Sequence, residues 1–173
     1  MIINPINLLE TGALKSDECP QKNIQPNGID FNLDRVFQLV SHTEDIPFIS
    51  ETDKKFFDLE EVYPDINGWF EFEQGVVYDC SAEQYCHIQE GTAAMLLVRS
   101  SLNCLGVALS AGLYDDSFKG NIGFTLQPRA GNIRIKKGTR VGQIVTWIAD
   151  SNGKYQGQYN SDANKHWREH FNG

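Results

Sequence analysis

The sequence lacks a hydrophobic run long enough to cross a membrane as a helix. Its longest apolar runs, such as residues 93–98, fall far short of the roughly 20 residues that a spanning helix needs. The opening residues, MIINPINLLETG, also lack the basic segment of a signal peptide. We therefore expect a soluble, cytoplasmic protein with no membrane partner.

Cysteine is scarce, with four in 173 residues, and no two of them form a CxxC pair. Cys80, Cys86 and His87 suggest a metal site, but the spacing and the missing second ligand pair match no zinc template. His166 and His170 have helical i, i+4 spacing without a third ligand nearby. We expect free thiols and a fold that needs neither disulfide nor zinc.

Basic residues are too few for nucleic-acid binding, because the net charge is −8 and a phosphate backbone is held by a basic surface. Their distribution is uneven. Residues 44–90 hold thirteen of the twenty-three acids. Seven of the fifteen basic residues stand in a later segment with only two acids: Arg99, Lys119, Arg129, Arg134, Lys136, Lys137 and Arg140. A locally positive site for a small polyanion is one interpretation, and ordinary solvated side chains are the other.

The chain length predicts one domain over residues 1–173. From residue 69 onward the pattern is short strands punctuated by glycine, without a long amphipathic helix, which is typical of an all-β jelly roll or barrel. A short helix is expected over 4–14, with Asn4 as its N-cap. The tail over 150–173 is polar, and we expect a mobile arm there.

Alternation of apolar and polar residues over 29–34 predicts a strand with one wet face. The acidic stretch 41–68 contains Pro47, Pro64 and Gly68 as breakers. It is expected to form excursions between short strands rather than a second domain.

Three motifs follow in order between residues 99 and 145. In the first, Arg99, Ser100 and Ser101 place two hydroxyls beside a guanidinium at the end of a strand. Such groups bind phosphate oxygens, although serine there is equally suited to cap a helix.

The second motif, GLYDDSFKG, carries two adjacent carboxylates between glycines. A carboxylate in a cleft can orient and deprotonate water, but adjacent acids also occur in plain turns. If the segment is extended, only one of Asp115 and Asp116 faces a given side. Phe118 is either a platform beneath a sugar or part of the core.

The third motif, KKGTRVGQIV, sets Gln143 in an apolar strand. A buried glutamine needs hydrogen-bond partners. A ligand oxygen and a backbone group of a neighbouring strand are both candidates.

Together these motifs resemble the trimeric dUTPase and dCTP deaminase superfamily. IQPNGIDFNL at 24–33 and GKYQGQ at 153–158 are similar to dCTP deaminases. The middle, AGLYDDSFKGNIGF and KKGTRVGQIV, is closer to trimeric dUTPases. The resemblance implies a dUTPase-like jelly roll, a homotrimer with sites at subunit interfaces, and a deoxynucleoside triphosphate substrate of dUTP or dCTP type with Mg²⁺.

The resemblance also assigns roles to residues. Asp115 matches the acid that activates the attacking water, and Asp30 an acid that contacts the metal through water. The positions that match phosphate-binding residues are Arg99, Ser100, Ser101, Gln143, Lys154 and Gln158. Those that match the base and sugar site are Ala111, Gly112, Leu113 and Phe118.

Two departures separate the activities. Where the deaminases have a water-activating glutamate and an arginine, this sequence has Thr125 and Cys104. The resemblance therefore favours pyrophosphohydrolysis of dUTP. A dCTP deaminase and a nucleotide-binding regulatory protein with little turnover stay as alternatives.

Overall fold

The structure is a computed structural model that describes residues 1–10, 21–41, 46–157 and 160. Three short helical segments occur among them: α1 (Pro5–Glu10), the 3₁₀ turn η1 (Gln21–Asn23) and α2 (Ser100–Cys104). The strands are β1 (Ile24–Gln25), β2 (Gly28–Val40), β3 (Phe48–Ile49), β4 (Lys54–Lys55), β5 (Asp58–Val62), β6 (Trp69–Phe72), β7 (Tyr78–His87), β8 (Thr92–Val98), β9 (Val107–Ser110), β10 (Lys119–Pro128), β11 (Ile133–Lys136) and β12 (Arg140–Ile148).

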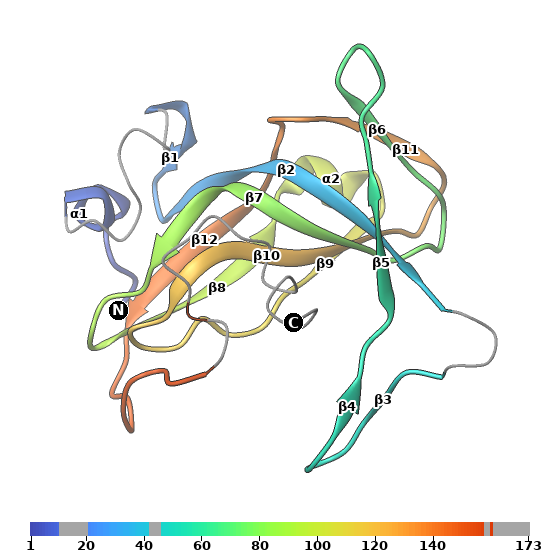
Figure 1. Ribbon diagram of the computed structural model, residues 1–173. Coiled ribbons are helices and arrows are strands. Elements are labelled where there is room, and N and C mark those ends of the chain that lie inside the picture. The colour runs from blue at the N-terminus through green and yellow to red at the C-terminus, as the bar shows by residue number, and fades with distance from the viewer. Residues whose placement is uncertain (11–20, 42–45, 158–159, 161–173) are drawn as a thin grey trace.

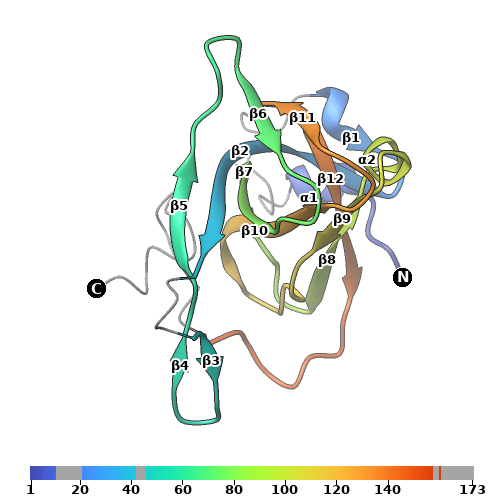
Figure 2. The same cartoon turned by 90° about the vertical axis from the view of Figure 1, so that its right-hand side faces the viewer.

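The main sheet has the strand order β8-β12-β2-β7-β10-β9, with every pairing antiparallel. Beyond β9 the chain returns to β8, where Ala94 and Tyr114 exchange two backbone hydrogen bonds of 2.9 Å. The sheet is thereby nearly closed into a barrel, and α2 lies in the connection between β8 and β9 (Figures 1 and 2). The predicted all-β barrel is confirmed.

The barrel interior is filled by alternate residues of its strands, as the period of two requires. Phe31 of β2 and Phe124 of β10 meet there with ring centroids 5.1 Å apart. A Cβ atom on Gly142 would lie 2.1 Å from the Phe31 ring, so the glycine makes room for that ring. The fully buried side chains of these two strands include Ile29, Leu33, Val36, Ile122 and Leu126.

The expected wet face of β2 is wrong. Asp30 and Asn32 point away from the barrel interior, yet they are only 1% and 5% exposed. The segment 21–25 covers them, with Asn23 Nδ2 donating to the Asp30 carbonyl at 2.9 Å and to Asn32 Oδ1 at 2.7 Å. The Asp30 and Asn32 side chains can be buried here because each finds hydrogen-bond partners.

The N-terminal helix begins as predicted, with Asn4 Oδ1 accepting a hydrogen bond from the Ile6 N–H at 3.0 Å. Its expected end near residue 14 lies outside the described residues. None of the helices over the described residues has the length and apolarity to span a membrane.

Residues 46–57, here called the β3–β4 arm, stand clear of the barrel in both views (Figures 1 and 2). The short strands expected within 41–68 are β3, β4 and β5, and β5 pairs with β2 at the barrel. β6 pairs with β11 in a second two-stranded ribbon, which lies at the other end of the molecule from the β3–β4 arm (Figures 1 and 2).

Candidate functional site

Four polar side chains meet on the outer face of β2 and β12. Asp30 Oδ2 lies 3.2 Å from Arg99 Nε and 3.2 Å from Arg140 Nη1. Asp30 Oδ1 accepts a hydrogen bond from Gln143 Nε2 at 3.3 Å. We call Asp30, Arg99, Arg140 and Gln143 the anion cluster. The structure thus joins three residues that the sequence singled out, and it adds Arg140.

Strand register positions this cluster. Gln143 pairs with Asp30 on one side and with Leu97 on the other, so its side chain projects beside the Asp30 carboxylate. Gly28 leaves space for it, because a Cβ atom there would lie 2.7 Å from Gln143 Cγ and 2.6 Å from the Ile144 carbonyl oxygen. Arg140 is anchored from the covering segment, with Nη1 donating to the Lys22 carbonyl at 2.6 Å.

The cluster carries a net positive charge at its surface. Asp30 is buried, whereas the Arg99 and Arg140 side chains are 30% and 29% exposed. Each guanidinium has five N–H donors in a fixed fork. Two guanidiniums on one carboxylate leave an excess positive charge with donors at the surface, which suits the oxygens of an anion.

Among the described residues, the Gln143 side chain donates to the Asp30 carboxylate, a partner that the sequence did not suggest. That Gln143 also binds a ligand oxygen stays a prediction. Ser100 and Ser101 open α2 directly after Arg99, and both are exposed. The N-cap residue of α2 is Arg99, and its side chain makes no capping hydrogen bond. A serine side chain therefore does not cap this helix. The Ser100 side chain is exposed beside the cluster.

A second group of predicted residues lines one cavity of about 510 Å³ over β9 and β10. Ala111, Gly112, Leu113 and Phe118, all assigned to base and sugar, belong to it. Its wall is otherwise mostly apolar or small, and we call it the apolar cavity. Thr125, which the sequence analysis named as a departure from the deaminases, also lines it. The lining residues that the sequence reading missed are Ser110, Tyr114, Asn121, Gly123, Phe124 and Tyr155.

Aromatic rings build one wall of the apolar cavity. Phe118 packs edge-on against Tyr114 and Tyr155, with centroids 5.1 and 5.4 Å away. Tyr114 is fixed in turn, since its hydroxyl donates to the Gly123 carbonyl at 2.9 Å and accepts from the Gly123 N–H at 3.0 Å. Burial raises the pKa of Tyr114, so it stays a neutral hydroxyl. Phe118 is only 8% exposed, and it serves both the core and the cavity.

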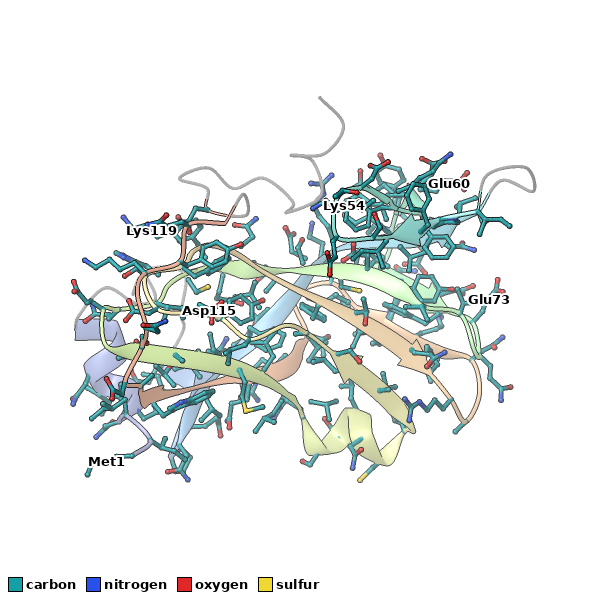
Figure 3. The ribbon with its side chains drawn as sticks, turned by 90° about the horizontal axis from the view of Figure 1, so that it is seen from below. Met1, Lys54, Glu60, Glu73, Asp115 and Lys119 are labelled. Carbon is teal, nitrogen blue, oxygen red and sulfur yellow. The ribbon has the colours of Figure 1, made fainter. Side chains whose placement is uncertain are left out.

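The two adjacent acids have different environments. Asp116 is 6% exposed, and its carboxylate accepts bonds from the Ser117 hydroxyl at 2.6 Å and the Gly91 N–H at 2.8 Å. These donors hold the pKa of Asp116 below its usual range. Asp115 is exposed, in the turn between Tyr114 and Phe118 near the start of β10 at Lys119 (Figure 3). The chemically available carboxylate is therefore Asp115.

A third feature is a polar cavity of about 550 Å³ that shares Tyr155 with the apolar cavity. Lys154 lines it, and Lys154 Nζ lies 2.7 Å from Glu90 Oε2, a hydrogen bond that raises the pKa of Lys154. The Tyr155 N–H donates to the Asp116 carbonyl at 2.7 Å. Residues 154 and 155 thus lie against the turn that carries Asp115, whereas Gln158 lies outside the described residues. That the arm is mobile stays a prediction.

Two other basic residues of the segment 99–140, Arg134 and Lys137, make ordinary ion pairs. Arg134 lies 2.6 Å from Asp65, and Lys137 lies 2.9 Å from Asp34. The four side chains of these pairs are between 32% and 50% exposed, so the pairs contribute little to stability. Arg134 and Lys137 are therefore ordinary solvated side chains, which is the second of the two interpretations of the basic segment.

Within one chain the anion cluster and the apolar cavity are separate. Tyr114 attaches to β8 at Ala94, whereas Gln143 faces Leu97, about 10 Å further along the strand at 3.3 Å per residue. Across the sheet, β12 and β8 lie between Asp30 and the 111–114 segment, which adds about 15 Å at 4.8 Å per strand. None of the cluster residues lines either cavity.

Comparison with known families assigns the chain. The family model of dCTP deaminase-like proteins matches residues 6–148. The chain belongs to the dCTP deaminase-like family. The matched residues include the barrel strands, the anion cluster and every lining residue of the apolar cavity except Tyr155.

Relatives in this family carry two names. A protein of Methanopyrus kandleri named "probable deoxyuridine 5'-triphosphate nucleotidohydrolase" is 36% identical over 136 residues, covering 78% of this chain and 86% of the relative. One of the same name from Methanothermobacter thermautotrophicus is 30% identical over 137 residues, covering 79% and 87%. A "dCTP deaminase" of Sulfurisphaera tokodaii is 24% identical over 156 residues, covering 87% and 82%.

A solved member of the wider family has the same fold. The crystal structure of the 2'-deoxycytidine 5'-triphosphate deaminase from Agrobacterium tumefaciens matches 86% of this chain with a TM-score of 0.65 and 18% identity. The match covers 48% of that deaminase, so this chain spans about half its length. The predicted dUTPase and dCTP deaminase fold is confirmed.

The two departures from the deaminase pattern fall at different places. Thr125 lines the apolar cavity opposite Ser110, its cross-strand partner. Cys104 is exposed at the end of α2. The resemblance places the water-activating glutamate of the dCTP deaminases at the position of Thr125, and a threonine hydroxyl cannot replace that carboxylate as a base.

Proposed function

We propose that this protein hydrolyses dUTP, or a closely related pyrimidine deoxynucleoside triphosphate, to the monophosphate and pyrophosphate. One observation carries the proposal. Asp115 is an exposed carboxylate in the turn between two cavity residues, Tyr114 and Phe118, while Thr125 lines the same cavity without a carboxylate. The 30–36% identity to proteins named for dUTP hydrolysis supports the same choice.

In this proposal the apolar cavity holds the base and the deoxyribose. Residues 111–113 and Phe118 line it; backbone groups of 111–113 would contact the base, and the Phe118 ring would offer a flat apolar surface to the sugar. A largely apolar cavity of about 510 Å³ with a few polar groups has the size and character of a small-molecule site.

The phosphates would be bound from another copy of the chain. On one chain the anion cluster lies away from the cavity, as its strand positions show. A homotrimer brings the cluster of one subunit to the cavity of the next, and Arg99, Arg140, Ser100, Ser101 and Gln143 then face the triphosphate. Lys154, together with Gln158, would complete the phosphate site from the C-terminal segment.

Magnesium fits this site as a companion of the triphosphate. Over the described residues, no three His, Cys, Asp or Glu side chains gather in a way that could hold a metal. Asp30 is unsuited to direct coordination, because it is buried and both its oxygens already accept bonds from the cluster. Asp30 Oδ1 would contact the magnesium ion only through a bridging water. Bound Mg²⁺ would neutralise phosphate charge, with ligands chiefly from the phosphates and water.

The reaction itself requires a positioned water. Asp115 would accept a proton from the water while the water oxygen bonds to the α-phosphorus. The bond from that phosphorus to the oxygen bridging to the β-phosphate breaks, and pyrophosphate leaves. Arg99 and Arg140 would stabilise the negative charge on the phosphates, which is the main demand of phosphoryl transfer.

A substrate panel tests the proposal. The full chain is incubated with each deoxynucleoside triphosphate and Mg²⁺, and the products are separated by chromatography, with UTP as the ribose control. Pyrophosphate release from dUTP is expected. Ammonia release from dCTP would instead identify a deaminase, and tight binding without product would identify a regulatory protein.

A further inference from the structure

Asp115 and Phe118 lie in a turn with a strained backbone. Ser117, between them, is the one residue other than glycine with a positive φ among the described residues, at 64°. L side chains rarely adopt this left-handed conformation, and it persists only where the surrounding contacts fix it. The places of the Asp115 carboxylate and the Phe118 ring therefore depend on the contacts that hold this turn.

Tyr114 ties the start of the turn to the barrel. Its backbone exchanges two hydrogen bonds of 2.9 Å with Ala94 of β8. Its side chain is buried, and the ring packs edge-on against Phe118 with centroids 5.1 Å apart. Tyr114 is thus fixed directly before Asp115 in the chain, and it touches the other residue of the turn to which the proposed function gives a role.

The hydroxyl of Tyr114 ties the turn to β10. Strand β9 pairs with β10 only as far as Ser110 and Thr125, two residues short of Gly123. At Gly123 the hydroxyl takes the place of a neighbouring strand, because it donates to the carbonyl at 2.9 Å and accepts from the N–H at 3.0 Å. We call these two hydrogen bonds the Tyr114 clasp. The clasp closes the segment 115–122 into a loop against a strand that lines the apolar cavity.

Other contacts of the turn reach different elements. The Asp116 carboxylate accepts from the Gly91 N–H at 2.8 Å, in the connection between β7 and β8. The Tyr155 N–H donates to the Asp116 carbonyl at 2.7 Å. Neither bond ties the turn to the β10 wall of the apolar cavity, whereas the Tyr114 clasp does. The clasp needs a neutral hydroxyl that donates and accepts at once, and burial maintains it by raising the pKa of Tyr114.

We propose that Tyr114 is a positioning residue, whose clasp on Gly123 sets the direction of the Asp115 carboxylate and the place of the Phe118 ring. This role rests on the proposed function, in which Asp115 activates water and Phe118 contacts the sugar. Displacing a reacting group by about 1 Å can cost about 10²-fold in rate. One hydroxyl, bonded to Gly123 as both donor and acceptor, thereby controls turnover and sugar selection together.

The test removes the hydroxyl alone, with Tyr114→Phe in the full chain. Loss of the clasp should lower kcat for dUTP by about 10- to 100-fold. KM should change by less than about threefold, because Asp115 acts on the water in the transition state rather than on the bound substrate. The ratio of kcat/KM for dUTP to that for UTP should fall by about tenfold, since the Phe118 ring loses its support.

Tyr78→Phe is the matched control. Tyr78 is also buried, and its hydroxyl accepts from the Glu73 N–H at 3.0 Å, but it lines neither cavity. Each variant loses one buried hydroxyl, so each should lower the melting temperature by about 2–6 °C. Only Tyr114→Phe should lose turnover and sugar selection. On an active wild type, equal kcat and equal sugar ratios in the two variants overturn the proposal.

Hydrogen exchange tests the clasp without depending on activity. The Gly123 amide should exchange at least about tenfold faster in Tyr114→Phe than in the wild type, and at the wild-type rate in Tyr78→Phe. Unchanged exchange of this amide in Tyr114→Phe also overturns the proposal. A wild type that binds dUMP but releases no pyrophosphate from dUTP contradicts the proposed function alone. The role of Tyr114 is then decided by the ratio of dUMP to UMP affinity, measured by calorimetry, which should fall about tenfold in Tyr114→Phe and stay unchanged in Tyr78→Phe.

Discussion

At the scale of single residues, the adjacent carboxylates Asp115 and Asp116 differ in exposure, because Asp115 is exposed and Asp116 is buried. Asp115→Asn is expected to lower turnover of dUTP by about 10²–10⁴, the usual loss on removing a general base, with substrate affinity within about tenfold. Calorimetry and a pyrophosphate assay measure the two quantities. Near-normal turnover would show that Asp115 does not activate water.

The matched control for this prediction is Asp116→Asn. Asp116 accepts bonds from Ser117 and Gly91 and is buried, so its substitution should lower the melting temperature while keeping turnover within about tenfold of wild type. If Asp116→Asn is the more damaging of the two for turnover, the roles assigned to these acids are reversed.

Phe118 is the residue expected to select deoxyribose by shape. Phe118→Ala should raise kcat/KM for UTP relative to dUTP, within the range of about 10–200-fold that steric fit can supply. Because Phe118 is buried between Tyr114 and Tyr155, the same change should also cost about 3–5 kcal/mol of stability. Phe118→Tyr keeps the ring and should keep the ratio. An unchanged ratio in Phe118→Ala, with lower stability, would limit Phe118 to the core.

At the scale of elements, the segment 21–25 is a cover that holds β2 and the anion cluster together. Asn23→Ala should lower the free energy of unfolding by about 1–3 kcal/mol, because the Asp30 carbonyl and Asn32 Oδ1 would stay buried without their donor. Chemical denaturation measures this. Lys22→Ala is the control, since Lys22 holds Arg140 through its backbone carbonyl alone. Equal stability of Asn23→Ala and Lys22→Ala would mean that the cover contributes nothing.

The same elements show what the sequence could and could not predict. Alternation over 29–34 correctly indicated a strand, because the period of two is local. The burial of Asp30 could not be predicted, since it depends on Arg99, Arg140 and Asn23, which come from other parts of the chain. Arg140 was missed as a cluster residue for the same reason, although its motif was recognised. Residues 111–113 were placed with Phe118 only through the family resemblance, and the structure finds them around one cavity.

At the scale of the whole molecule, the proposed site is split between copies, and this can be tested without knowing the assembly's structure. The anion cluster and the apolar cavity sit on different strands of one chain. Arg99→Gln damages the first and Asp115→Asn disables the second. Each variant alone should therefore be nearly inactive.

Coexpression of the two variants should restore activity, because some sites would combine the intact cavity of one subunit with the intact cluster of its neighbour. In a random equal mixture about one quarter of the interfaces in a cyclic oligomer meet this condition, so turnover should approach about a quarter of wild type. Coexpressing Asp115→Asn with the double variant Arg99→Gln/Asp115→Asn is the control, since no combination of those chains contains an intact Asp115. If the first mixture is no more active than the control, while mass measurements show mixed assemblies, then each chain carries a complete site. The anion cluster would in that case serve the structure of the barrel surface rather than the phosphates of a neighbour's substrate.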